Sequence, residues 1–131
     1  MATEATLACR AAAVLTNAEV DGAVLDLRNA LDGEVTIECD FTVDTLTNCT
    51  LRVYAGSATP PTTPLHLNGV VQTYLLTGDS TPSFVVKAHG ARYLMVSAEG
   101  IGACGASSLT MDYYYLNTLA TSLVDGQQQI N

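Results

Sequence analysis

The stretch EVTIECDFTV at residues 34–43 constrains the fold more than any other, because apolar and polar residues alternate along its whole length. Successive side chains of a β-strand point to opposite faces. One face of this strand is therefore expected to carry five apolar residues: Val35, Ile37, Cys39, Phe41 and Val43. The other face carries acids and threonines and should meet water. A strand with one dry face needs a second layer to cover it, which favours an antiparallel sheet packed in a sandwich.

Further short strands are expected between turn signals along the rest of the chain. They are predicted at residues 23–28, 49–55, 70–77, 83–88, 91–99 and 107–117. The Asp-Gly pair at 32–33 should reverse the chain, because these residues readily adopt the positive φ of tight turns. Regularly spaced short strands without intervening helices predict an all-β fold. We expect an antiparallel β-sandwich of seven to eight strands, in Greek-key or jelly-roll form.

Two pairings between sequence neighbours are also expected. The strand at 34–43 should form a hairpin with the strand at 49–55, because the inward residues of both then lie opposite each other. The strands at 83–88 and 91–99 should pair in the same way across the short turn between them.

The chain has 131 residues, enough for a single domain with its own core. We expect the sandwich to occupy residues 21–117, with an extended arm at 1–20 and a polar tail at 118–131. The alanine content of residues 1–20 also fits a short helix, but the threonine-rich flanks favour an arm with strand character. The proline-rich stretch 56–68 should be irregular, either as a binding loop or as a passive crossover between sheets.

Charged residues make up only 14% of the chain, and 13 acidic residues against 5 basic ones give a net charge of −8. This balance argues against nucleic-acid binding, which needs clustered lysine and arginine. No apolar run reaches the roughly 20 residues that span a membrane. Glu4 and Arg10 interrupt the pattern of a signal peptide, so none is expected. Sparse charge is typical of surfaces buried in assemblies, although an ordinary small β-sandwich fits it equally well.

Residues able to carry catalysis or bind a metal are present, but they form no recognised motif. His66 and His89 are the only histidines, and no nucleophile elbow accompanies them. Glu34, Glu38 and Asp40 share one strand face, where neighbours are about 7 Å apart. One strand alone offers too few ligands for a cation, so a solvated face is the expectation. We expect no catalytic residue, no metal site and no cofactor.

The four cysteines, Cys9, Cys39, Cys49 and Cys104, lack the Cys-x-x-Cys spacing of zinc sites and thioredoxin-like proteins. Cys39 is expected to be a buried free thiol that packs as a small hydrophobe. Cys9 and Cys104 lie in the expected arm and at a glycine-rich loop tip. A disulfide between subunits at Cys9 and Cys104 is therefore one hypothesis.

Four segments together resemble the small β-sandwich accessory proteins of tailed bacteriophage particles: AVLDLR at 23–28, EVTIECDFTV at 34–43, ARYLMVSAEGIG at 91–102 and SSLTMDYYYL at 107–116. The resemblance implies a decoration or cement protein of the capsid, made in the host cytoplasm and located at the virion surface. It further implies a multimer that binds the lattice of the major capsid protein, with terminal arms that reach neighbours and without catalysis.

The expected function is therefore that of a structural virion protein, which stabilises the phage head by binding the major capsid protein and copies of itself. Its contacts are expected at apolar residues and prolines of the arm, the proline-rich stretch and the tail: Leu7, Val14, Leu15, Pro60, Pro61, Leu65, Leu119 and Leu123. The alternative is a tail, fibre or carbohydrate-binding sandwich with exposed aromatic residues. Its candidates are four tyrosines, Tyr54, Tyr74, Tyr93 and Tyr114, although tryptophan, which such sites favour, is absent.

Overall fold

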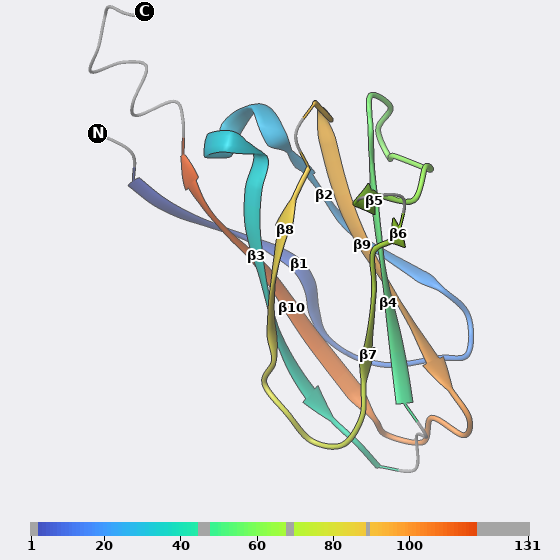
Figure 1. Cartoon of the computed structure of the whole chain (residues 1–131). Helices are drawn as coiled ribbons and strands as arrows, with labels where there is room; N and C mark the ends of the chain where they lie inside the picture. The colour runs from blue at the N-terminus through green and yellow to red at the C-terminus, as the bar shows by residue number, and fades with distance from the viewer. Residues whose placement is uncertain (1–2, 45–47, 68–69, 89, 118–131) are drawn as a thin grey trace, which may run out of the picture.

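The computed structural model describes residues 3–44, 48–67, 70–88 and 90–117 and shows two four-stranded antiparallel sheets packed face to face (Figure 1). The first sheet, in the order β1-β10-β3-β8, contains β1 (Thr3–Val14), β3 (Glu34–Thr42), β8 (Ser83–Lys87) and β10 (Ser108–Asn117). The second sheet, in the order β2-β9-β4-β7, contains β2 (Val20–Asp26), β4 (Asn48–Gly56), β7 (Thr73–Leu76) and β9 (Tyr93–Ile101).

The remaining described elements are short. They are a ribbon of β5 (His66–Leu67) and β6 (Val70–Val71), and two 3-10 turns, η1 (Leu27–Asn29) and η2 (Leu31–Gly33). The second of these turns sits where the sequence predicts a reversal, with φ of 59° at Asp32 and 63° at Gly33. In the described part of the chain, no helix has the length and apolarity to cross a membrane.

The order of the strands is that of a jelly roll. The chain changes sheet at almost every step, so strands that pair within a sheet are distant in the sequence: β1 pairs with β10, β3 with β8 and β10, and β4 with β9. Two sheets connected in this way form a double Greek key. The predicted all-β antiparallel sandwich is confirmed.

The core lies between the sheets and is built by strand alternation. In β3, Val35, Ile37, Cys39 and Phe41 are buried, as the alternating pattern predicts. In β10, Leu109, Met111 and Tyr113 face the same interior, and all three are inaccessible to solvent. Burying each large apolar side chain contributes about 1.5–3 kcal/mol relative to leaving it exposed, so these two adjacent strands supply much of the packing of the first sheet.

The expected hairpin between residues 34–43 and 49–55 is wrong, because β3 and β4 belong to different sheets. The inward faces were still predicted correctly, since both strands turn their apolar residues toward the shared core. The expected pairing of 83–88 with 91–99 is wrong for the same reason. β8 lies in the first sheet and β9 in the second.

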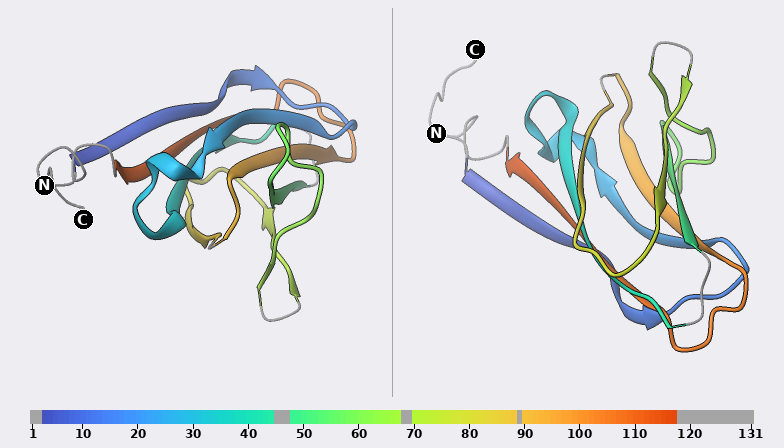
Figure 2. Two further views of the ribbon diagram at one scale, coloured as in Figure 1. Left: turned by 90° about the horizontal axis from the view of Figure 1, so that it is seen from above. Right: turned by 60° about the horizontal axis from the view of Figure 1, so that its bottom comes forward.

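The N-terminal segment differs from the expected arm. Residues 3–14 have the strand character expected of them, but β1 is an edge strand of the first sheet, paired with β10 from Thr3↔Asn117 to Val14↔Ser108 (Figure 2). Two register shifts interrupt this pairing between Ala8 and Ala13. The sandwich therefore begins at β1 rather than at residue 21. The predicted tail at 118–131 lies outside the described residues.

Two close contacts fix the sheets to each other. The Tyr113 hydroxyl, which comes from the first sheet, donates to the Ala23 carbonyl at 2.8 Å and accepts from the Val96 amide at 3.0 Å in the second. Both partners lie at the register shift between β2 and β9, where the strand-to-strand pairing is interrupted. Close by, a Cβ on Gly22 would lie 2.5 Å from the Cys9 sulfur and 2.6 Å from the Val96 carbonyl oxygen, so only glycine fits there.

The proline-rich stretch folds back on the second sheet. The Ala55 amide donates to the Thr63 carbonyl at 3.0 Å, and the Leu65 amide donates to the Val53 carbonyl at 2.9 Å. Pro61 is fully buried. The part of the stretch from Pro61 to Leu65 therefore packs along β4 and extends the edge of the sandwich.

Candidate functional site

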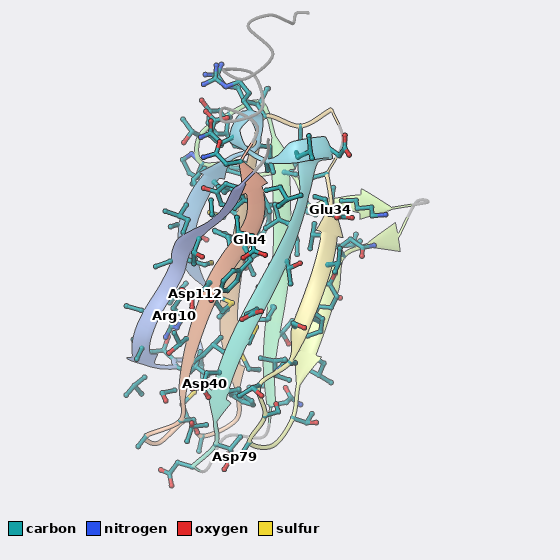
Figure 3. All side chains as sticks on the ribbon, turned by 90° about the vertical axis from the view of Figure 1, so that its left-hand side faces the viewer. Glu4, Arg10, Glu34, Asp40, Asp79 and Asp112 are labelled. Carbon is teal, nitrogen blue, oxygen red and sulfur yellow. The ribbon has the colours of Figure 1, made fainter. Side chains whose placement is uncertain are left out.

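The outer face of the first sheet gathers carboxylates around a small apolar centre. Alternation in β3 turns Glu34, Glu38 and Asp40 outward, and β10 adds Asp112, Tyr114 and Leu116. Glu4 of β1 and Val85 of β8 complete the set from the two edge strands. We call these eight residues the acidic face. Figure 3 shows four of its carboxylates, Glu4, Glu34, Asp40 and Asp112, on the side of the molecule formed by this sheet.

The register places like charges directly opposite each other. Glu38 of β3 pairs with Asp112 of β10, and Asp40 is two residues further along β3, opposite Thr110. Directly opposed like charges on a sheet destabilise the strand pair, by amounts similar to the about 0.2–1 kcal/mol that a favourable pair contributes. The acidic face therefore carries an electrostatic cost in the free protein.

Few cations offset these carboxylates. Lys87 approaches Glu34 at 3.6 Å. Arg10 also lies on this side (Figure 3), but its guanidinium donates to backbone carbonyls, that of Leu109 at 3.0 Å among them. Among the described residues, no ion pair involves the remaining carboxylates of the acidic face: Glu4, Glu38, Asp40 and Asp112.

Two neighbouring hollows follow the acidic face. The larger, about 480 Å³, is lined by Glu4, Glu34, Glu38, Tyr114 and Leu116 among others. The smaller, about 350 Å³, is lined by Glu38, Asp40 and Asp112 together with threonine and serine residues. Glu38 borders both, so the two hollows lie side by side on the acidic face.

The centre of the acidic face is apolar and exposed. Tyr114 is 38% accessible, Leu116 43% and Val85 57%. Tyr114 and Val85 both flank Thr36 in the strand register, so they lie on one row across the sheet. Tyrosine surrounded by polar groups is typical of protein contact surfaces. In the described part of the chain, no histidine, cysteine or acidic residues gather closely enough to hold a metal ion.

A second polar cluster lies on the outer face of the second sheet. Arg52 pairs with Glu99 at 2.7 Å and with Glu19 at 3.6 Å, and the hydroxyls of Tyr54 and Ser97 both donate to the Glu19 carboxylate. Partial burial raises the pKa of Glu19, but these two hydroxyl donors and Arg52 outweigh it and hold that pKa below its ordinary value. Every member of the cluster has a partner, so it fastens the β1–β2 connection to the sheet.

The sequence did not reveal this cluster. Glu19, Arg52 and Ser97 lie on three separate segments, and only the strand order brings them together. The alternation of LRVYA around Arg52 marks that residue as outward-facing, but no local pattern identifies its partners.

The cysteines are free thiols, and three of them are buried. Burial raises the pKa of Cys39 to about 12 and that of Cys49 to about 11. Cys9 is only 4% exposed and faces the Val96 carbonyl. Cys104 is half-buried near a loop tip. The expected disulfide between subunits at Cys9 and Cys104 fits this arrangement poorly, because the Cys9 thiol is enclosed between the sheets.

The predicted contact residues are divided between core and surface. Leu15 and Pro61 are buried, and Leu7 and Leu65 pack partly against the core, so these four contribute to the fold. Val14, at 54% accessibility, is exposed, as is Pro60. The last two predicted contacts, Leu119 and Leu123, lie outside the described residues.

The histidines add no described site. The backbone of His66 lies in β5, but its side chain is not described. His89 is likewise outside the described residues.

The four tyrosines named for a carbohydrate site do not share a platform. Tyr74 points inward and stacks on Phe84, with ring centroids 4.0 Å apart. Tyr54 belongs to the polar cluster of the second sheet, Tyr93 lies under the Arg92 guanidinium, and Tyr114 is on the acidic face of the other sheet.

Comparison with known proteins yields likeness of fold alone. No protein-family model matches the chain, and no curated protein matches it. Among solved structures, the SPBc2 prophage-derived protein YomS is similar with a TM-score of 0.57 and 13% identity, over 88% of this chain and 95% of that one. A prophage-derived protein is thus among the structural neighbours.

Two further solved structures are more distant. A rhamnosidase from Klebsiella oxytoca has a TM-score of 0.45 and 13% identity, over 79% of this chain and 21% of the rhamnosidase. A protein of Bacillus endospore appendages, described as disulfide-linked pili, has a TM-score of 0.39 and 15% identity, over 88% of this chain and 90% of that one. These values are too low to carry a functional argument.

Proposed function

We propose that this chain is a structural protein of a tailed-phage particle, which decorates the head and stabilises it by binding the lattice of the major capsid protein. The observation that carries the proposal is the acidic face, a surface with an exposed apolar centre on which four of the five carboxylates form no ion pair within the described chain. A surface of this kind suits contact with another protein.

The fold likeness supports the choice of a phage particle. One similar solved structure is a prophage-derived protein, and the likeness covers 88% of this chain and 95% of that one. The low content of charged residues, 14%, is in keeping with a protein that works inside an assembly.

The proposed mechanism is mechanical and not catalytic. Copies of the chain, synthesised in the host cytoplasm, bind the outside of the head across the seams between capsid subunits. Each contact can be weak, because many contacts made at once hold far more strongly than any single one. Association of the chain with copies of itself adds to this effect.

The carbohydrate-binding alternative has less support. A sugar platform needs several aromatic rings on one surface, and the four tyrosines are distributed over both outer faces and the interior. A location in the tail remains compatible with a protein contact surface, and the test below separates it from the head.

The test is to purify particles released by a strain that carries the gene and to label them with gold-tagged antibodies raised against this chain. We expect many gold particles on each head. Absence of the chain from purified particles, or labelling confined to the tail, would overturn the proposal. Particles from the same strain with the gene deleted provide the control, and a loss of head integrity at high temperature is expected in them.

A further inference from the structure

We infer that the acidic face is the docking surface for a cationic protein segment, rich in lysine or arginine, with an apolar side chain at its centre. The identity of the partner as a capsid protein rests on the proposed function. The chemistry of the docked segment rests on the acidic face alone.

Charge is the first reason. In the described chain, Arg28 pairs with Asp26, and Arg52 pairs with Glu19 and Glu99. Arg10 lies on the same side as the acidic face, but its guanidinium donates to backbone carbonyls and forms no ion pair there. Arg92 lies 5.0 Å above the Tyr93 ring. Among the residues that the structure describes, Lys87 is the one cation in an ion pair with the acidic face, at Glu34. A partner that approaches this face therefore meets a strongly negative field, which favours a positive surface.

The directly opposed pair of Glu38 and Asp112 is the second reason. A cation placed between these two carboxylates would remove the repulsion that the free protein carries. The repulsion between Glu38 and Asp112 lowers the stability of the free protein. A positive partner relieves this repulsion, so its relief adds to the free energy of binding.

The apolar centre decides what kind of cation docks. Tyr114, Leu116 and Val85 are all exposed beside the carboxylates. A metal ion or a polyamine would satisfy the charges but would leave these side chains in water. A protein segment can place an apolar side chain over Tyr114 and cations around it, as contact surfaces with a central aromatic residue do.

Nucleic acid and a second copy fit less well. Phosphates would be repelled by the acidic face. A second copy that used the same face would bring two sets of carboxylates together, and the chain as a whole has a net charge of −8. The occupant that satisfies both charge and apolar contact is a different, cationic protein.

The test titrates isotope-labelled chain with a synthetic peptide, acetyl-Lys-Lys-Phe-Lys-Lys-amide, while amide chemical shifts are recorded. We expect the largest shifts at Glu38, Asp112 and Tyr114. Replacing the peptide's phenylalanine by serine should weaken binding about tenfold, because the apolar contact is lost. Spermidine and magnesium chloride are the competing probes, and binding of either at this face as tight as that of the phenylalanine peptide would overturn the inference.

Asp112→Asn is the decisive variant, and Asp21→Asn is its matched control. Asp21 lies on β2 in the other sheet, is exposed, and loses the same single charge. Asp112→Asn should weaken peptide binding severalfold while raising the urea midpoint of the free protein, since it removes the opposed charge. Asp21→Asn should change neither. Equal effects of the two variants, or shifts spread over the second sheet, would overturn the inference.

The outcomes separate this inference from the proposed function. The peptide titration needs no particle, so it decides the chemistry of the acidic face by itself. If the chain decorates heads but Asp112→Asn binds the peptide like the wild type, the docking inference fails and the proposed function stands. If the chain is absent from particles but the peptide binds as expected, the proposed function fails and the docking inference stands.

Discussion

Replacing Tyr113 by phenylalanine should destabilise the protein well beyond what the loss of one exposed hydroxyl would cost. The Tyr113 hydroxyl is inaccessible to solvent and bonds to both sides of the register shift between β2 and β9. Phenylalanine keeps the ring in the core and removes these two bonds together with the hydroxyl's contact to the Cys9 thiol. The substitution therefore isolates the polar connection between the sheets from the apolar packing.

The magnitude follows from what each partner loses. The Val96 amide belongs to a residue with no exposed surface, so it is left buried without an acceptor, which costs about 1–3 kcal/mol. The bond to the Ala23 carbonyl is only partly buried, so water can replace it and the added cost is smaller. We expect a total loss of about 2–3 kcal/mol. At about 4 °C per kcal/mol for a chain of this length, Tm should fall by roughly 8–12 °C.

Urea unfolding followed by circular dichroism measures this loss, and Tyr114→Phe is the matched control. Tyr114 is the next residue, points to the opposite face and is 38% exposed, so removal of its hydroxyl should change the free energy of unfolding by less than about 0.5 kcal/mol. If the two variants lose equal stability, or Tyr113→Phe loses less than about 0.5 kcal/mol, Tyr113 does not connect the sheets as described.

Three further predictions concern close packing, thiol reactivity and pH. Gly22→Ala should lower the free energy of unfolding in urea by about 1–3 kcal/mol. Gly56→Ala is the control and should be nearly neutral, because its added Cβ would have its nearest neighbour at 3.9 Å. Similar losses of stability in the two variants would contradict the packing described. With Ellman's reagent at pH 8, Cys104 should react in the native protein and the other thiols only after unfolding, because burial raises the pKa of Cys39 to about 12. The pKa of Glu19 is lowered from 4.5 by its hydroxyl and Arg52 partners despite partial burial, so its stabilisation is present above pH 4.5 and lost as the pH falls further. Glu19→Gln should reduce the slope of stability against pH in that range, and an unchanged slope would refute this role.

The fold class could be predicted because alternation is a local property. The apolar face of residues 34–43 and the strand at 107–117 both appear in the structure as predicted, and each needs only the two-residue period of a strand. The turn at Asp32-Gly33 was likewise predicted from residue types that tolerate positive φ. These features depend on neighbours in the sequence, which the sequence displays directly.

The strand partners could not be predicted in the same way. Inward parity is satisfied whether β3 pairs with β4 in one sheet or faces it across the core, so the pattern cannot distinguish a hairpin from a crossover. The jelly roll uses the crossover at both places where a hairpin was expected. The sequence also predicted an arm where β1 forms an edge strand of the first sheet. Its alanine-rich sequence lacks the large alternating residues that mark the other strands, so no inward face could be recognised.

The acidic face could be predicted only in part. The sequence shows that Glu34, Glu38 and Asp40 share one side of a strand, and a solvated surface was the natural interpretation. The alternation of SSLTMDYYYL also turns Asp112 and Tyr114 away from the core. That these residues lie beside Glu38 and Thr36 depends on the pairing of β3 with β10, which are separated in the sequence by residues 43–107.

The residues that hold the fold together and those of the proposed docking surface lie in separate parts of this molecule, and that separation allows the acidic face to carry repulsion. Core packing, the Tyr113 bonds and the close approach at Gly22 hold the sheets together from the inside. The opposed pair of Glu38 and Asp112 lies outside this core, on the outer face of the first sheet, so its repulsion does not disturb the core packing. Inner variants such as Tyr113→Phe should therefore lower stability and leave peptide affinity unchanged below the unfolding transition. Asp112→Asn should raise stability and weaken peptide binding. A variant that lowers, or raises, both stability and peptide affinity would show that the core and the acidic face are coupled.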